Sequence, residues 1–450
     1  MLGFAAAAGG ALFSPVLGVI GYVLHYDIGP ERQWWNADLR MFGLRYSYTL
    51  AIMIGIGIAL NFRSLRWGKA LLVGQEKLML AFLAIVWGVS LITESPVYTQ
   101  VDPPWIKMTK LLVFVLMMTH VVTTVRYMNW LFWALVVGSL ILGLEAYTAG
   151  RGAFAVGRLE LVGGPDFQDS NALAAYLAAM LPIIGIQFLR SPWYGKLLCL
   201  AAGVFTANAI ILTRSRGAVV GLAVGAAMAV VLAPRKYRAK IGLGLVAVAI
   251  GGTFLADVGF WERASTINSP EQEMDASARS RFEIWEGGIQ MAKDHPLGVG
   301  PGNFGRHIGN YLPQYAGRDA HNTYVRCLCE VGWVGLAVFA ALIVNAAICM
   351  WRVMRRSQDL PDKDRDHVAY LSYALLVSLV IFAACGVWGS LVYTESLWWL
   401  LAMPVCMMRV TENIEEDAGA AFPMLRERSA DRFNWRRARK PRKRAWTPVQ

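Results

Sequence analysis

The sequence predicts an all-α, polytopic membrane protein with about twelve transmembrane helices. Of its 450 residues, 56% are hydrophobic and only 16% are charged, and the mean hydropathy is +0.42. Soluble domains carry roughly a quarter charged residues. Several apolar runs reach the length of about 20 residues that crossing a bilayer requires. No signal-peptide cleavage pattern follows the first run, so we expect it to be retained as a span.

The apolar runs place one transmembrane domain over residues 1–409. Residues 197–233 are too long for one crossing, and Arg214 and Arg216 at their middle would be costly inside a bilayer. A tight turn at 213–217 is therefore predicted, which makes these residues a helical hairpin. The expected spans are 2–24, 46–61, 77–93, 107–125, 130–149, 171–189, 197–213, 217–233, 241–258, 323–350, 369–388 and 393–408.

The basic residues of the short connections predict the orientation, because Lys and Arg favour the cytoplasmic side. With twelve spans they share one side, so both termini are expected to be cytoplasmic. These residues are Arg63, Arg66, Lys69, Arg126, Arg190, Lys196, Arg235, Lys236, Arg238, Lys240, Arg352, Arg355 and Arg356. Residues 410–450 are expected to form a disordered basic tail near anionic lipid headgroups. No aromatic–basic module accompanies the tail, so no nucleic-acid partner is expected.

Two substantial segments, 150–170 and 259–322, fall on the opposite side. Long loops with polar content concentrate function. The same side carries cations that the orientation rule disfavours, namely Lys107, Arg158, Arg214, Arg216, Arg279, Arg281, Arg306 and Arg318. Snorkelling toward headgroups is the favoured explanation for Lys107, Arg306 and Arg318. A functional role is favoured for Arg216, because its turn has almost no slack.

Arginines gathered outside the membrane suit a phosphate ligand, because their planar forks bind phosphate oxygens bidentately and stay charged. A lipid diphosphate with an outward headgroup fits this pattern, whereas the chain has no P-loop for ATP. His321 lies where the long segment enters the next helix. A neutral imidazole there would accept a proton from a hydroxyl near neutral pH, although a capping or structural role explains the residue equally well.

Three other patterns are interpreted without a cofactor or metal. The six cysteines lie in or beside apolar runs without zinc-ligand spacing, so they are read as small apolar side chains. Residues 300–305 match G-x-G-x-x-G, but no strand precedes them, and a tight turn against the membrane is favoured. Residues 362–366 resemble a D-x-D motif, but alternating basic residues favour a solvated cytoplasmic loop.

Three blocks together resemble the O-antigen ligase/polymerase superfamily of bacterial envelope glycosyltransferases. They are Leu-Thr-Arg-Ser-Arg-Gly-Ala at 212–218, Arg-Phe-Glu-Ile-Trp at 281–285 with His-Pro-Leu-Gly-Val-Gly-Pro-Gly-Asn-Phe at 295–304, and His-Asn-Thr-Tyr at 321–324 with Glu-Val-Gly-Trp-Val-Gly-Leu at 330–336. Each block is weak alone, but their order around one long external segment is specific. Within this superfamily the chain is most similar to the O-glycosylation ligases that accompany exosortase systems, and the stretch 156–173 contributes to that resemblance.

The resemblance implies a GT-C-type glycosyltransferase of the bacterial inner membrane with a periplasmic active site. The donor would be a glycan on undecaprenyl diphosphate, and the acceptor a hydroxyl of a glycolipid, protein or envelope glycan, without metal or nucleotide. It assigns His321 as general base and Arg216 and Arg281 to the diphosphate and its developing charge. The expected substrate-binding residues are Arg158, Arg214, Arg279, Asn322 and Lys107.

Rival functions remain open at this point. An O-antigen-type polymerase uses the same donor and differs in the acceptor. A twelve-helix transporter or lipid flippase would be expected to show duplicated halves and ionisable residues at the midplane, rather than cations at one surface. A scaffold without catalysis would tolerate His321→Ala.

Overall fold

The computed structural model describes residues 2–33, 45–68, 70–94, 102–155, 157–233, 235–255, 261 and 276–421. This part of the chain is a helical bundle with one two-stranded antiparallel hairpin, β1 (Phe154–Ala155) and β2 (Arg158–Leu159). The helices are α1 (Leu2–Phe13), α2 (Pro15–Ile28), α3 (Tyr46–Leu60), α4 (Gly74–Ile92), α5 (Pro104–Val121), α6 (Val125–Thr148), α7 (Ser170–Arg190), α8 (Trp193–Thr213), α9 (Arg216–Leu232), α10 (Arg235–Leu255), α12 (Ala276–Asp294), α13 (Phe304–Tyr311), α14 (Thr323–Arg356), α15 (Asp362–Cys385) and α16 (Glu395–Ala421).

The composition of these helices confirms an all-α, polytopic membrane protein. Within the described residues, seven helices are long and apolar enough to cross a membrane: α4, α5, α6, α7, α8, the α14 segment and α15. Helices α1, α2, α3 and α9 are apolar but shorter. The total of twelve spans therefore stays a prediction.

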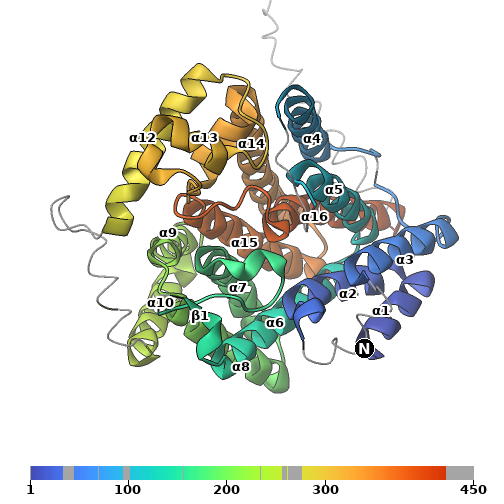
Figure 1. The fold of residues 1–450 in the computed structure, drawn as a ribbon. Coiled ribbons are helices and arrows are strands. Elements are labelled where there is room, and N and C mark those ends of the chain that lie inside the picture. Colours follow the sequence, from blue (N-terminus) through green and yellow to red (C-terminus); the bar gives the residue numbers. More distant parts are fainter. Residues whose placement is uncertain are drawn as a thin grey trace, which may run out of the picture.

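Helices α15 and α16 occupy the centre of the bundle (Figure 1). Helix α15 packs on α7, α9, α14 and α16, and α16 also contacts α5. The alanine-rich sequence of α7 permits this close packing, since small side chains let helix backbones approach. The largest fully buried side chains include Trp398 and Trp399 of α16. In the same view α12 and α13 lie beside α14 at the margin of the bundle.

The expected single span 2–24 is wrong, because the chain folds back on itself within it. Helix α1 ends at Phe13, and Pro15 opens α2 after Ser14 in an extended conformation. Pro15 has no backbone N–H to continue the first helix. A Cβ added at Gly18 would lie 2.8 Å from the Cβ of Ala11, and one at Gly21 would lie 2.4 Å from that of Ala7. Small residues on both legs therefore permit an antiparallel pair of short helices.

This hairpin changes the direction of the N-terminal segment. The ring of Phe4 contacts Tyr46 at the start of α3, whereas Asn61 at the end of α3 donates a hydrogen bond to Leu12 O. Arg66, just beyond that end, pairs with Asp417 of α16. The beginning of α1 and the end of α16 thus lie at opposite ends of α3. The chain after Ala421 lies outside the described residues, so the cytoplasmic side expected for both termini stays a prediction.

The predicted turn in residues 197–233 is confirmed, but its two helices diverge. Arg214 caps α8 in the left-handed region at φ 48°, and Ser215 caps α9 by accepting the Ala218 N–H at 3.4 Å. Helix α8 then packs mainly on α6 and α7, whereas α9 packs mainly on α15. A Cβ at Gly225 would lie 2.2 Å from Ile381 Cγ1, so glycine lets α9 approach α15 closely.

The segment 259–322, expected as one long loop, contains helices α12 and α13. The glycine-rich stretch between these two helices forms the predicted tight turn and packs on a break in α14. Gly332 leaves helical geometry at φ 73° and ψ −177°. The turn satisfies the carbonyls released there, because Val299 N donates to Cys329 O at 2.8 Å and Gly300 N donates to Glu330 O at 3.1 Å. Left-handed φ at Gly298, Gly300 and Gly302 shapes this turn.

The C-terminal boundary also differs from the prediction. Helix α16 continues to Ala421, so residues 410–421, expected as disordered tail, are helical. The basic cluster of the tail lies outside the described residues; it comprises Arg436, Arg437, Arg439, Lys440, Arg442, Lys443 and Arg444.

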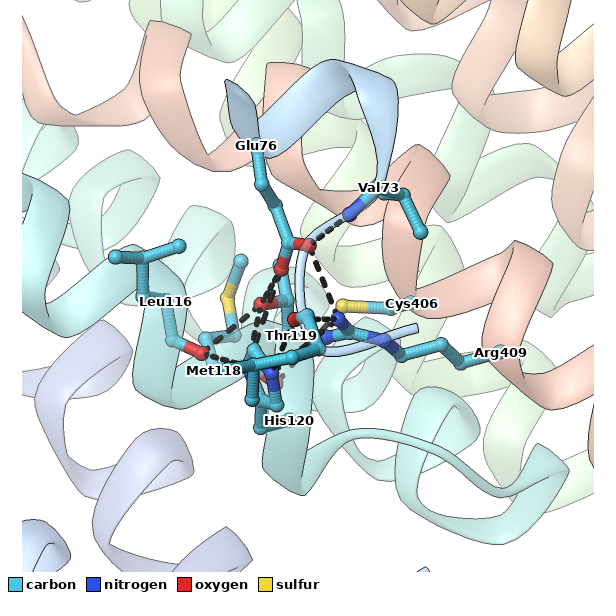
Figure 2. A network of polar contacts seen from close by, with 9 residues as sticks. Val73, Glu76, Leu116, Met118, Thr119, His120, Cys406 and Arg409 are labelled. Atoms are coloured by element: carbon cyan, nitrogen blue, oxygen red, sulfur yellow. Dashed lines mark hydrogen bonds and ion pairs between the residues drawn. The ribbon is translucent and has the colours of Figure 1, made fainter. Parts of the chain in front are cut away.

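A buried polar network ties the middle of α16 to α4 and α5 (Figure 2). Arg409 and Glu76 are fully buried and pair at 3.0 Å. Glu76 also accepts the Thr119 hydroxyl at 2.7 Å and the Val73 N–H at 2.9 Å, while His120 lies 3.3 Å from the Arg409 guanidinium. Arg409 lies near the middle of α16, about four turns beyond Glu395.

Candidate active site

The beginnings of α7 and α14 and the end of α15 meet at one end of the bundle, around the connection 386–394. Thr323, the first residue of α14, donates its N–H to Gly386 O at 2.8 Å and its hydroxyl to Gly389 O at 2.6 Å. A Cβ added at Gly389 would lie 3.6 Å from the Asn171 Cβ in the first turn of α7. Segments far apart in sequence therefore share this end.

His321 lies at this end, one residue before the N-cap of α14. Its backbone adopts the left-handed region at φ 45°, which non-glycine residues rarely occupy. Such strain costs of order 1–3 kcal/mol and persists where the surroundings enforce it. Asn322 follows as the N-cap, and its side-chain oxygen accepts the N–H groups of Tyr324 at 2.9 Å and Val325 at 3.1 Å. The cap gives Asn322 a structural task, so its expected contact with substrate stays a prediction.

Charged groups surround the imidazole of His321. Burial lowers its pKa, Asp319 and Asp169 raise it, and Arg281 and Arg158 lower it, with a net result below the usual value. Asp319 Oδ2 lies 3.8 Å from Nδ1. A lowered pKa keeps the imidazole neutral near pH 7, and neutral imidazole is the form that accepts a proton.

Arg158 joins β2 to the turn between α8 and α9. Its Nε donates to Thr213 O at 3.0 Å, and its Nη2 donates to Asn171 Oδ1 at 2.9 Å. Ser215 donates its hydroxyl to the same Asn171 oxygen at 3.0 Å. A Cβ added at Gly157 would lie 3.2 Å from Arg214 Nη1, so the Arg214 guanidinium reaches the hairpin as well.

Tryptophan packing connects α12 to the start of α9. Arg281 is buried in α12, and Trp285, one turn later, donates its indole N–H to Ala320 O at 2.8 Å, next to His321. The rings of Trp285 and Trp388 lie 5.6 Å apart. A Cβ added at Gly217, the second residue of α9, would lie 2.6 Å from Trp388 Cβ. Arg216, Arg281 and His321 thus come from elements that pack around Trp388.

One comparison with known families bears on this end of the molecule. Residues 201–340 match a family model described as O-Antigen ligase. The match supports the O-antigen ligase superfamily. It suggests a membrane enzyme that transfers glycans. No curated protein matches the sequence.

The matched region of the O-antigen ligase model includes the turn between α8 and α9, helix α12 and His321, whereas Arg158 and Lys107 lie outside it. Lys107, which is half-buried, forms an ion pair with Asp166. Asp166 also accepts the Tyr26 hydroxyl and the Glu395 N–H, each at 2.9 Å. The structure thus gives Lys107 a carboxylate partner, and its expected contact with substrate stays a prediction.

The remaining cations lie in the first turn of α12, in α13 and in the segment after α13. Arg279 is exposed in α12 and interacts electrostatically with Tyr315, as does Arg318. Arg306 pairs with Glu94 at 3.1 Å through two exposed side chains. Among the described residues, no three His, Cys, Asp or Glu side chains are grouped closely enough to hold a metal ion.

Sequence reasoning missed Arg326, which holds the carboxylate beside His321. Its Nη1 lies 3.3 Å from Asp319 Oδ1, and its Nε lies 3.1 Å from Glu330 Oε1, one turn later in α14. Burial raises the pKa of Asp319, but Arg326, a hydrogen bond from Ser390 and the nearby His321 together more than offset this, and the net pKa is lowered. Asp319 is therefore ionised at neutral pH. The sequence did offer one signal for this ion pair: Arg326 and Glu330 lie four residues apart in an otherwise apolar helix.

Proposed function

We propose that this protein is a glycosyltransferase of the O-antigen ligase type, acting at the periplasmic face of the bacterial inner membrane. Its donor is a glycan carried on undecaprenyl diphosphate, and its acceptor is a hydroxyl of a glycolipid, protein or envelope glycan. The observation that carries the proposal is a mostly neutral imidazole, His321, within electrostatic reach of two arginines from separate segments, Arg158 and Arg281. The family match over residues 201–340 supports the same reaction class.

The reaction is a single displacement at the anomeric carbon of the donor. His321 removes the proton of the acceptor hydroxyl, whose oxygen forms the new glycosidic bond. The bond between the anomeric carbon and the phosphate oxygen breaks, and its electron pair leaves with the lipid diphosphate. The configuration at the anomeric carbon is inverted, and neither metal nor nucleotide takes part.

The arginines stabilise the diphosphate as it gains negative charge. Arg216 and Arg281 are assigned to the phosphate oxygens, where fixed cations lower the barrier most because charge develops there. Arg158 and Arg214 stand at the turn before α9 and extend the same cationic surface. Asp319 is a positioning residue, held by Arg326, that keeps an anion beside the imidazole as it becomes protonated.

The test is a purified assay that follows transfer from undecaprenyl-diphosphate-linked oligosaccharide, in the presence of EDTA and without nucleotide. The wild-type protein should release the lipid diphosphate and form a glycosylated acceptor. Arg216→Ala should reduce the turnover by about 10²–10³-fold, the size expected for losing a charge-stabilising group. Arg318→Ala, an exposed arginine of the same face, is the matched control and should keep its activity. Equal activity of Arg216→Ala and wild type would reject the assigned role.

A further inference from the structure

A groove between α12 and α13 opens next to the candidate active site. Its volume is about 570 Å³, and aromatic rings line it from three positions, Phe282, Trp285 and Tyr311. Polar side chains of α12, Glu286 and Gln290, share the lining. The groove is therefore an amphipathic surface within the described residues, with aromatic faces and hydrogen-bonding groups side by side.

The groove continues from the residues assigned to the reaction. Trp285 lines it and donates its indole N–H to Ala320 O, directly before His321. Arg281 precedes Trp285 by one turn on the same helix. The lining positions 282, 286, 289, 290 and 293 recur on one face of α12 and run away from Arg281 over about 16 Å. A molecule whose phosphate binds at Arg281 could therefore extend along this groove.

The chemistry of the lining selects among possible occupants. Phe282 is 44% exposed and Ile289 is 43% exposed, so apolar faces are available for stacking. The carboxylates of Glu283 and Glu286 outnumber the single ammonium group of Lys293, which disfavours phosphate or an anionic lipid surface. An isoprenoid chain would leave these polar groups unpaired. A carbohydrate presents both apolar C–H faces and hydroxyls, which matches rings beside carboxylate and amide groups.

We propose that this groove binds the glycan of the lipid-linked donor, with the sugar nearest the diphosphate at Trp285 and the following sugars along α12. The inference rests on the proposed function and adds the subsite that recognises the transferred chain. Ile289 and Gln290 are the residues that test it, because both side chains line the groove from exposed positions of α12 beyond Trp285.

The experiment compares two donors in the purified transfer assay: undecaprenyl diphosphate carrying the full oligosaccharide from native membranes, and the same lipid carrying only its first sugar. Ile289→Ala and Gln290→Ala should each raise the KM for the oligosaccharide donor by about five- to tenfold, as the loss of one contact predicts. They should leave the single-sugar donor unchanged. Gln314→Ala and Leu297→Ala are matched controls, since both residues are exposed in the same region but outside the groove.

Binding of the oligosaccharide released from its lipid separates this inference from the proposed function. Weaker binding by Ile289→Ala and Gln290→Ala than by the controls supports the groove even if no transfer occurs. Equal effects of the variants on both donors, or a raised KM for the acceptor alone, would overturn the donor subsite. An effect that follows the anionic lipid content of vesicles, and not the donor length, would assign this face to the membrane and overturn it as well.

Discussion

The bundle contains two clusters in which an arginine joins a carboxylate, and they differ in exposure and backbone geometry. Arg409 and Glu76 are 1% and 0% exposed and lie in regular helices. Around His321, Asp319 is 35% exposed, Arg326 is 23% exposed, and the histidine itself has left-handed backbone geometry. The Arg409–Glu76 pair is thus inaccessible to solvent, whereas the charged groups around His321 are accessible to a ligand.

The difference separates a structural role from a functional one. A buried ion pair without access contributes to packing, and loss of one partner leaves an uncompensated charge. A strained, partly exposed group surrounded by unlike charges is typical of a reactive site. Removing residues of the His321 cluster should therefore affect turnover, whereas removing residues of the Glu76 cluster should affect folding.

The largest effect is expected for His321→Ala. Loss of the general base should reduce turnover by roughly 10²–10⁴-fold without lowering the yield or the thermal midpoint of the purified protein. His307→Ala removes a histidine of α13 and serves as the matched control. A His321→Ala protein with wild-type turnover would remove the contrast between the two clusters, as would one that fails to fold.

Arg409→Met tests the sealed cluster. The change leaves the Glu76 carboxylate buried without its cation, so we expect about 3–5 kcal/mol of destabilisation, measured by denaturant unfolding in detergent. The folded fraction should keep its turnover. Arg66→Met is the control, because its pair with Asp417 is more than half exposed on both sides and should contribute about 1 kcal/mol or less. Comparable stability of the two variants would contradict a structural role for Arg409.

A third prediction concerns the broken helix α14 behind the candidate site. Gly332 has φ 73°, and an added Cβ would lie 2.5 Å from Pro296 O. Gly332→Ala should cost about 1–3 kcal/mol of stability and lower turnover, since the turn 296–303 rests on this break. Gly88→Ala, in α4 with open space around its Cβ, should be neutral or slightly stabilising. A neutral Gly332→Ala would show that the break is not required.

Much of the fold followed from hydropathy, because long apolar runs such as those of α7 and α15 have few alternatives in a bilayer. The failures have physical causes. Residues 2–24 are apolar on average, but Ser14, Pro15 and the small residues on either side permit a hairpin that mean hydropathy does not detect. Helices α12 and α13 lack the apolar length of a span, so the sequence presented them as loop.

The candidate site was predictable where a charged or titratable residue occupies a position that a purely structural role does not easily explain. Arg216 at a short external turn and His321 at a helix entrance drew attention for that reason. Lys107 has the same charge, but its partner Asp166 lies 59 positions away in the sequence, and only the fold brings them together. Arg326 was overlooked because its role depends on simultaneous contacts with Asp319 and Glu330, which the sequence alone does not show.

The smallest expected effect is a shift in the pH dependence of Asp319→Asn. The reaction needs neutral imidazole, so turnover should rise with pH through the pKa of His321, which burial places below the usual value near 6.5. The negative charge of Asp319 favours imidazolium and raises that pKa, so its removal should move the rise in turnover to lower pH, by about one unit or less.

The plateau at higher pH should fall only a few-fold, because the base itself remains. Asp294→Asn, which removes an exposed carboxylate bound to Tyr311, is the control and should leave the profile in place. A purely structural Asp319 would lower turnover equally at every pH. A shift of the profile toward higher pH would mean that the carboxylate does not act on His321 through its charge.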